Sequence, residues 1–537
     1  MILLSRNDAF RWHEYLECYL KGYFYETDLN HRLIIEDLLN ITDIDGYKNY
    51  LRSLNGEFSM LRESEDFIVA AVDFNRSFPL YYSSINNTLV ISDSIKGILN
   101  FIKEPKVDDI AVRELRISGT TFGDRTLFED IKTLGCGEML FYDKNSEELI
   151  IEEYMDFDKE PFSTATLSEL VEEMNEVYTN AVANSLLPLK DRTIVVPLTS
   201  GWWQRVLIGK IKELGFKNVV CYTYGGRNNS DVPEARKIAE YYGYPWYFIE
   251  YDAFEWYKWF TGKDYKKYKD YASQYVTVPN LGEYLAVKTM TERKIVPENA
   301  VFINVCFTGV LRGDLLPKIF LDESKLGEDN LNYEIMREIA SNIKWNRKDY
   351  QLMNEYIDDI FMRHSGSEEF KKKSIVWKFK YAYWKERVGK HLSNSRRIYE
   401  MYGYVWRNIQ LEKNIIKFWS KVPNDMRYLT ALQHEYDMIY NSELIEAVGI
   451  KPESMRRSLV PNLKDKFRAR FPKYYRKINF LNKSKALTNA YDEHPLLWYN
   501  IISRREFERF KESVSSITGV QSIKYLRDFF KEHDHSL

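Results

Sequence analysis

The chain has 537 residues, of which 45% are hydrophobic, 29% charged and 15% aromatic, and its formal net charge is −3. This balance excludes an intrinsically disordered chain and gives no reason to expect a nucleic-acid partner. No run approaches the roughly 18 to 20 apolar residues of a membrane-spanning helix, so we expect no transmembrane segment and a cytoplasmic protein.

Short runs of β-forming residues occupy the first part of the chain and are separated by turn signals such as Asn55-Gly56 and Asn86-Asn87. Sequential short strands are typical of antiparallel sheets. We therefore expect a β-rich domain over residues 1–160. Its predicted strands are 54–62, 67–73, 79–83, 88–92 and 138–142.

A polar, proline-bearing stretch is the expected linker to a second domain, and strands alternate with helices after it. Alternation at this spacing predicts a parallel sheet with crossover helices. The second domain is expected over residues 167–450 and to be helical beyond residue 330. Its predicted helices are 167–186, 205–214 and 234–242, and its predicted strands are 193–198, 219–224 and 246–251.

The last part, 451–537, is predicted to be a helical extension, and it is locally basic. A solvated helix face and a surface for an anionic partner both explain this charge, and the balanced charge of the whole chain favours the first.

Cysteines and histidines do not suggest a metal site. The four cysteines, at positions 18, 136, 221 and 306, form no CxxC pair, and the eight histidines form no cluster at ligand spacing. We therefore predict neither a disulfide framework nor a metal site made of protein ligands alone.

The segment 193–214 is a buried strand, a loop and a helix, and its loop reads Thr199-Ser200-Gly201. Such a loop, at the carboxyl end of a parallel strand, is where α/β proteins bind phosphate. Free backbone N–H groups and the positive end of the helix dipole point toward it. These three residues are therefore predicted to contact phosphate.

This segment resembles the pyrophosphate-binding loop of the asparagine synthetase family, in which the strand ends in a Ser-Gly-Gly-x-Asp-Ser pattern. The sequence VVCYTYGG at 219–226 is similar to the family's second strand, and 233–251 is similar to its second helix and third strand. Upstream, Leu54, Gly56 and Phe58, then Pro79 to Tyr82, resemble its N-terminal glutaminase-type domain. Two further segments, 384–407 and 418–428, resemble its C-terminal helices.

The resemblance implies an α+β, Ntn-hydrolase-like sandwich followed by an α/β synthetase domain of the PP-loop ATP pyrophosphatase type. Its closest likeness is to the branch found with surface-polysaccharide biosynthesis. The implied activity is an amidotransferase or ligase that uses ATP with Mg²⁺ to convert a carboxylate to an amide. The implied acceptor is a sugar acid, or aspartate as in asparagine biosynthesis, and the oligomeric state is left open, a homodimer included.

The same resemblance implies two groups of site residues. Lys390 and Arg387 are the catalytic candidates, with Arg397, because they would neutralise pyrophosphate or hold an anionic substrate. Helix-face ion pairs with Glu386 and Glu400 explain Lys390 equally well and Arg397 better. The implied ATP-binding residues are Leu198, Thr199, Ser200, Gly201, Thr223, Tyr224, Gly225, Thr308 and Gly309.

The chain departs from the family at the glutaminase nucleophile. The family's glutaminase uses an N-terminal cysteine, whose own amine serves as the base. Here Met1 is followed by Ile2, and Cys18 lies within a predicted strand as a small buried residue. We therefore expect no glutaminase activity, and ammonia or an amine as the nitrogen source.

Two positions that carry acids toward Mg²⁺ in the family are also changed. Trp203 and Gln204 stand where the loop has Asp and Ser, and Val310 stands where a second loop has an acid. Asp314 would compensate only if that loop is shifted, and Arg312 adds a cation. Either a tryptophan stacks on a base or sugar, or the loop is packed shut.

These changes leave three functions open. The first is the amide-forming ligase. The second is a non-catalytic relative that binds a nucleotide, a glycan precursor or a partner protein. The third is a macrocyclase or a β-lactam-type synthetase on the same scaffold.

Overall fold

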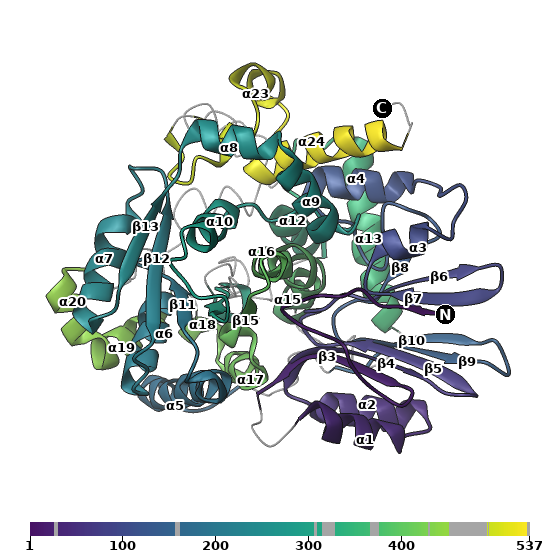
Figure 1. Cartoon of the computed structure of the whole chain (residues 1–537), viewed down its shortest axis with the longest axis horizontal. Helices are drawn as coiled ribbons and strands as arrows, with labels where there is room; N and C mark the ends of the chain where they lie inside the picture. Colours follow the sequence, from purple (N-terminus) through teal and green to yellow (C-terminus); the bar gives the residue numbers. More distant parts are fainter. Residues whose placement is uncertain are drawn as a thin grey trace.

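The computed structural model describes residues 1–25, 30–155, 162–305, 309–313, 328–365, 375–427, 430–450, 491 and 493–533. Within these ranges the chain forms three β-sheets, two in the N-terminal part and one parallel sheet after residue 190 (Figure 1). The structure is therefore a mixed α/β protein with a sheet-rich N-terminal part, as the sequence predicted.

Two sheets pack face to face in the N-terminal part. The four-stranded sheet has the order β1(Ile2–Leu3)-β7(Thr88–Ser92)-β6(Tyr81–Ile85)-β8(Lys132–Thr133). The six-stranded sheet has the order β10(Leu149–Glu153)-β9(Glu138–Asp143)-β5(Phe67–Val72)-β4(Gly56–Glu63)-β3(Cys18–Phe24)-β2(His13–Tyr15). One apolar cluster joins Leu61 and Ile68 of the larger sheet to Leu89 and Ile91 of the smaller one. The pairs within both sheets are antiparallel except β1 with β7.

Helices cover the outer faces of this sandwich (Figure 1). Helices α1(His31–Leu39) and α2(Ile44–Ser53) lie against the six-stranded sheet, and α3(Ile95–Leu99) and α4(Asp109–Ser118) lie against the four-stranded sheet. Strand β5 is consequently buried on both faces, which explains why its sequence FIVAAV is continuously apolar instead of alternating.

The third sheet has the order β13(Trp246–Glu250)-β12(Val219–Gly225)-β11(Ile194–Pro197)-β14(Val301–Ile303)-β15(Val405–Arg407), and every neighbouring pair is parallel. The predicted helices are present as α5(Leu167–Leu186), α6(Trp202–Glu213) and α7(Asp231–Tyr242). Alternation of strand and helix periods was therefore sufficient to predict the core of this sheet.

The expectation that 384–407 is helical throughout was wrong at its end, because β15 joins the sheet beside β14. Residues Trp384–Leu392 form a π-helix, with bonds to the fifth residue along, before Ser393–Arg396 and α16(Arg397–Met401). A three-residue strand has no readable period in sequence, so only its pairing with β14 reveals it.

The rest of the described chain is helical. Its further helices are α8(Ala253–Phe260), α9(Lys263–Ser273), α10(Tyr284–Glu292), α11(Gly309–Arg312), α12(Glu328–Ile339), α13(Arg347–Ser365), α15(Ile375–Tyr383), α17(Lys413–Lys421), α18(Asn424–Arg427), α19(Ala431–Tyr440), α20(Ser442–Val448), α23(Arg504–Phe510) and α24(Ile517–Glu532). Most of the predicted basic segment, 451–490, lies outside the described residues.

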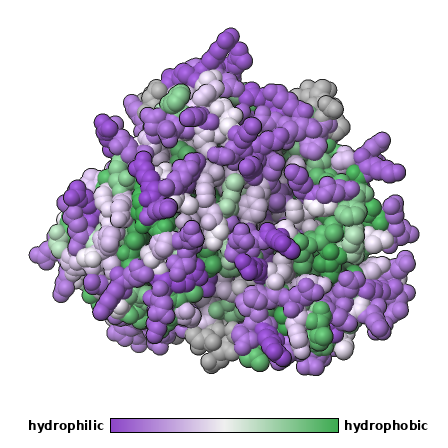
Figure 2. Space-filling view, in the orientation of Figure 1, coloured by the Kyte–Doolittle hydropathy of each residue, from purple (hydrophilic) through white to green (hydrophobic). Residues whose placement is uncertain are grey.

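Helix α24 does not extend away from the molecule. Tyr525, Leu526 and Phe529 of α24 share an apolar cluster with Ala111 and Leu115 of α4, so the C-terminal helix packs on the N-terminal part (Figure 1). The face shown in Figure 2 is mostly hydrophilic, with hydrophobic side chains in separate patches. No helix among the described residues is long and apolar enough to cross a bilayer.

Candidate functional site

A cavity of about 260 Å³ lies at the carboxyl edge of the parallel sheet. The ends of three adjacent strands form its floor: Leu198 and Thr199 follow β11, Thr223 and Tyr224 belong to β12, and Asn304 follows β14. Carboxyl ends of parallel strands are the usual place for ligands in open α/β sheets. The structure thus brings four of the residues implied to bind ATP, Leu198, Thr199, Thr223 and Tyr224, into one cavity.

Hydrogen bonds within the loop after β11, and one to Asp231, hold this loop in place. Gly201 caps α6, and its N–H donates to Thr199 Oγ1 at 3.1 Å. Ser200 Oγ donates to Asp231 Oδ1 at 3.0 Å, and Asp231 lines the cavity. Ser200 and Gly201 therefore shape the rim, although they do not line the cavity themselves.

A buried ion pair fixes the same loop to the helical part. Arg205 donates to Asp437 at 2.5 Å and also to the carbonyl oxygen of Ser200. Arg205 is 2% exposed and Asp437 is fully buried. Burial raises the pKa of Asp437, and Arg205 opposes that shift. The pair ties the loop to α19.

Of the two alternatives for the tryptophans, the structure contains the packed one, because both indoles belong to the buried core. Trp202 and Trp203 are each 2% exposed, and neither lines the cavity. The Trp203 ring lies 5.0 Å from that of Tyr178 in α5, and the Trp202 ring lies 5.7 Å from that of Tyr436 in α19. The helix start directs both indoles into the core, so they neither stack on a ligand nor fill the cavity; Gln204 is the neighbour that reaches it.

On the β12 side of the cavity, contacts of Thr223 and Gly225 fix the positions of neighbouring segments. Thr223 Oγ1 donates to the Leu198 carbonyl at 2.7 Å and accepts from Trp246 Nε1 at 3.0 Å, so this hydroxyl holds neighbouring strands. Gly225 has φ +131°, and a Cβ on it would lie 2.7 Å from the Pro495 carbonyl oxygen. Only glycine allows this close approach, which brings the C-terminal segment to the cavity, where Leu496 lines it.

The second predicted loop is described only in part. Thr308 and Asp314 lie outside the described residues, and Gly309 begins α11. The guanidinium of Arg312 lies 5.7 Å from the Trp202 ring, against the core and away from the cavity lining. Asn304 and Val305, just before this loop, do line the cavity.

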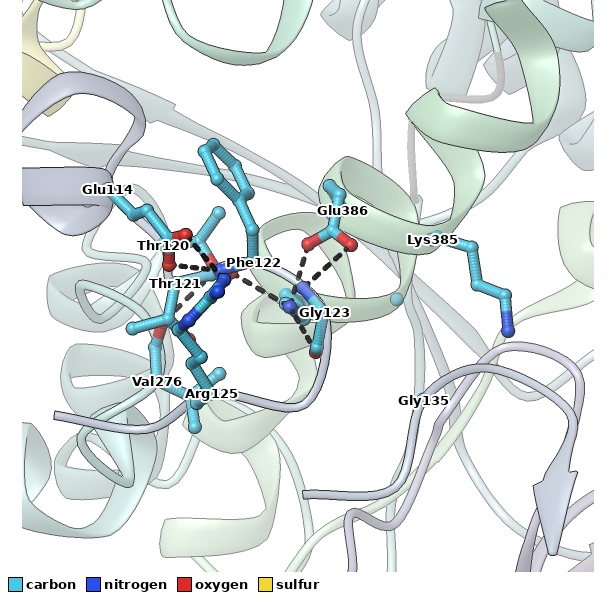
Figure 3. Close-up of polar contacts among 12 residues, drawn as sticks. Glu114, Thr120, Thr121, Phe122, Gly123, Arg125, Gly135, Val276, Lys385 and Glu386 are labelled. Carbon is cyan, nitrogen blue, oxygen red and sulfur yellow. Dashed lines mark hydrogen bonds and ion pairs between the residues drawn. The ribbon is translucent and has the colours of Figure 1, made fainter. Parts of the chain in front are cut away.

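Lys390 lies elsewhere, and its ammonium group is saturated. Its Nζ donates to the carbonyl oxygens of Thr121 at 2.8 Å and Gly123 at 2.9 Å, and to Glu386 at 2.7 Å. Figure 3 shows Glu386 facing Gly123 in this loop of the N-terminal part. Lys390 is 3% exposed and is not among the residues that line the cavity at the sheet edge. These contacts join the helical segment of Lys390 to the N-terminal part of the chain.

The other two cationic candidates are likewise placed away from that cavity. Arg397 pairs with Glu400 and donates to the Ser77 carbonyl. Burial lowers the pKa of Arg387, which lies near Tyr383 and Glu338. The ion pairs that the sequence offered as the alternative are present for Lys390 with Glu386 and for Arg397 with Glu400.

The residue that sequence reasoning missed is Glu283, directly before α10. It lines the cavity and is 8% exposed. Its carboxylate accepts from the hydroxyl groups of Tyr222 and, at 2.7 Å, Tyr399. Burial raises the pKa of Glu283 to about 7, and the Tyr399 hydrogen bond opposes the shift. No motif marks this glutamate, because three segments far apart in sequence create its surroundings.

The described cysteines have the character of core residues. Cys18 is fully buried in β3, as predicted, and burial raises its pKa to about 12. Burial also raises the pKa of Cys136 and of Cys221 to about 12. The Met1 amine donates to the Leu89 carbonyl at 2.8 Å in the β1–β7 pair, so it does not serve a thiol.

The side chains that line the cavity suit the nucleoside of a magnesium nucleotide but not its metal and phosphates. Aromatic, hydroxyl and amide side chains suit a nucleoside. In the described part of the chain, however, no three acidic, histidine or cysteine side chains gather to hold a metal, and no lysine or arginine lines this cavity. The residues therefore do not fit Mg²⁺ with a triphosphate.

Comparisons with known proteins assign no family. No family model and no curated protein matches the chain. Among solved structures it is similar to "the allosteric regulatory enzyme of purine biosynthesis", at 10% identity and TM-score 0.18, over 44% of this chain and 61% of that chain. It is also similar to glutamine phosphoribosylpyrophosphate amidotransferase from B. subtilis complexed with ADP and GMP, at 11% identity and TM-score 0.18, over 54% of this chain and 56% of that chain. The match spans less than two thirds of either protein. Likeness of this degree assigns no function, so the function has to be argued from the site.

Proposed function

We propose that this protein binds the nucleoside part of a nucleotide at the carboxyl edge of the parallel sheet. The proposed activity is that of an asparagine synthetase-like ligase that forms an amide on a carboxylate, and it requires residues beyond this cavity lining to hold Mg²⁺ and the phosphates. The observation that carries the proposal is the shared cavity of Leu198, Thr199, Thr223 and Tyr224. Leu198 and Thr199 follow β11, whereas Thr223 and Tyr224 lie in β12, and the family resemblance implies all four as ATP-binding residues.

The size and lining of the cavity support the nucleoside part of the proposal. About 260 Å³ is slightly below the roughly 300–1,000 Å³ range of small-molecule pockets, which suits a base with its sugar better than a whole nucleotide. The rings of Tyr222 and Tyr224 are stacked 6.2 Å apart on the cavity wall. Asn229, Asn280 and Asn304 add donors and acceptors.

The thiols of the N-terminal part bear on the nitrogen source. Its described thiols are buried with raised pKa values, so a bound glutamine would find no reactive sulfur there. We therefore propose ammonia or an amine as the nitrogen source. The proposed acceptor, a sugar acid or aspartate, rests on the family resemblance alone. A macrocyclase or β-lactam-type synthetase would instead take the amine from its own substrate.

A non-catalytic binding protein is the second candidate, and one observation favours it. The cavity holds two acids, Asp231 and Glu283, while two of the cations that the resemblance implies, Lys390 and Arg397, are engaged in ion pairs elsewhere. Loss of phosphate contacts would leave a nucleoside-binding scaffold without ligase chemistry.

Calorimetric titration tests the proposal. Adenosine, AMP and ATP are titrated into the full chain with and without Mg²⁺, and pyrophosphate release is followed with aspartate or glucuronate and ammonium. Binding of all three ligands with pyrophosphate release supports the ligase. Binding without turnover supports the non-catalytic candidate, and absence of adenosine, AMP and ATP binding contradicts both.

A Tyr224→Ala variant locates the binding. It removes a wall of the cavity and is expected to weaken adenosine binding by at least about tenfold, since aromatic stacking contributes on the order of 1–3 kcal/mol per base. Tyr241→Ala, an exposed tyrosine on α7, is the matched control and should bind as the natural protein does.

A further inference from the structure

Glu283 is a buried carboxylate without a counter-charge. Its two oxygens accept hydrogen bonds from Tyr222 and Tyr399, which are neutral donors. Among the residues that the structure describes, no lysine, arginine or histidine forms an ion pair with it. Burying a carboxylate without a cation is costly, and two neutral hydrogen bonds offset only part of that cost.

The cavity has room for the cation that Glu283 lacks. Each carboxylate oxygen has a second acceptor site after its tyrosine hydrogen bond. Glu283 lines the 260 Å³ cavity together with Asp231, and every described lining residue other than these two acids is uncharged. A cation with N–H donors would therefore satisfy both the charge and the free acceptor sites.

The surroundings leave few groups that change charge near neutral pH. Tyr222 and Tyr224 face Glu283 from β12, Tyr399 from α16, and Asp231 lies across the cavity on α7. Burial raises the pKa of Tyr224 to about 12 and that of Tyr399 far above its usual value, so both stay neutral. The charge of the cavity is thus set by Glu283 and Asp231.

We propose that Glu283 is the recognition residue for a protonated amine, either ammonium or a primary amine, in this cavity. The carboxylate would bind –NH₃⁺ by charge and by direct N–H···O hydrogen bonds, beside the residues proposed to hold the nucleoside. The role of this amine as nitrogen donor rests on the proposed function, whereas its binding does not.

The test measures thermal stabilisation of the full chain by ammonium and methylammonium chloride, against sodium chloride at equal ionic strength. Tetramethylammonium chloride is the second control, because it carries the charge without an N–H donor. Titrations at about pH 8 and about pH 6 give apparent dissociation constants. Because burial raises the pKa of Glu283 to about 7, amine binding should weaken by about tenfold at the lower pH.

Glu283→Gln keeps the size of the side chain and removes its charge. It is expected to weaken amine binding at about pH 8 by at least about tenfold and to abolish the pH dependence. Glu240→Gln, an exposed glutamate of α7 that pairs with Arg236, is the matched control and should behave as the natural protein does.

Two results would overturn the proposal: equal stabilisation by ammonium, tetramethylammonium and sodium, or equal amine affinity in Glu283→Gln and the natural protein. If the variant does not fold, the comparison of ammonium with tetramethylammonium on the natural protein still decides whether the cavity binds a protonated amine. Adenosine binding, measured separately, distinguishes failure of the amine site from failure of the proposed nucleoside site.

Discussion

Arg396 and Glu57 form an ion pair in which neither side chain has any exposed surface. Arg396 precedes α16 of the second part, and Glu57 lies in β4 of the N-terminal sandwich. Ser77 Oγ donates to Glu57 at 2.7 Å and accepts from Arg396 at 3.0 Å, and the Arg396 guanidinium lies 4.6 Å from the Trp406 ring. The pair joins the sandwich to the edge of the parallel sheet.

Arg396→Met should destabilise the protein by about 3–5 kcal/mol, because Glu57 would remain buried without its cation. Denaturant unfolding measures this change. Arg236→Met, which breaks an exposed pair with Glu240, is the control and should change the free energy of unfolding by less than about 1 kcal/mol. Equal effects of the two substitutions would show that burial does not govern the Arg396 contribution.

Lys390→Met is expected to act on stability. It removes three hydrogen bonds and leaves Glu386 buried without its lysine, at a cost of about 3–5 kcal/mol. Lys288→Met, which breaks a more exposed helical pair with Glu292, is the matched control. Adenosine affinity of the folded Lys390 variant should be unchanged. Normal stability together with loss of pyrophosphate release would restore the catalytic role implied by the family resemblance.

Trp203→Asp should destabilise the protein instead of supplying a magnesium ligand. The indole is 2% exposed beside Tyr178, so the substitution removes a large core side chain and buries a carboxylate, at about 3 kcal/mol or more. Trp203→Phe keeps part of the packing and should cost less. A stable Trp203→Asp variant with tighter, Mg²⁺-dependent ATP binding would contradict the core placement of this residue.

The pH dependence of stability should change in Glu283→Gln. Burial raises the pKa of Glu283 from 4.5 to about 7, so its protonated form favours the folded state. The stabilising contribution is complete below about pH 4.5 and is lost as pH rises through about 7, an effect on the order of 3 kcal/mol.

Relative to the natural protein, Glu283→Gln should therefore gain stability between about pH 5 and about pH 8. The difference between the two unfolding curves is the relevant quantity, because burial also raises the pKa of Glu114 to about 8 and that of Asp73 to about 7. Parallel curves for the two proteins over this range would show that Glu283 titrates as an exposed carboxyl.

The elements with a strong local period were predictable from sequence. The helix predicted at 167–186 is α5 with the same bounds, because its apolar positions recur at helical spacing and Thr166 with Glu169 forms a capping box at its start. Strands β11 and β12 were found because buried parallel strands are continuous apolar runs. Strand β13 lies at the edge of the sheet and is only partly buried, and its aromatic and β-branched residues revealed it. Strand β15 was missed because three residues carry no period.

The site was predictable where it depends on strand ends and not where it depends on packing. Leu198, Thr199, Thr223 and Tyr224 were identified because carboxyl ends of neighbouring parallel strands meet at one edge. The sequence left open whether Trp203 packs in the core or stacks on a ligand. It could not tell that Lys390 is engaged by a loop about 270 residues away, or that Leu496 closes the cavity.

The sequence by itself determined most of the strands and helices, the parallel arrangement of β11, β12 and β13, and the loop of small residues after β11, because these follow from local periodicity and turn chemistry. The tertiary structure decided which charges are compensated by residues far away in sequence. Lys390 finds Glu386 and two carbonyl oxygens, Arg396 finds Glu57, and Glu283 finds only tyrosines and a cavity. The spacing of Glu386 and Lys390 along the helix was readable in the sequence. The pairing of Arg396 with Glu57, and the lack of a cation at Glu283 among the described residues, depend on distance and burial in space, which no spacing along the chain records.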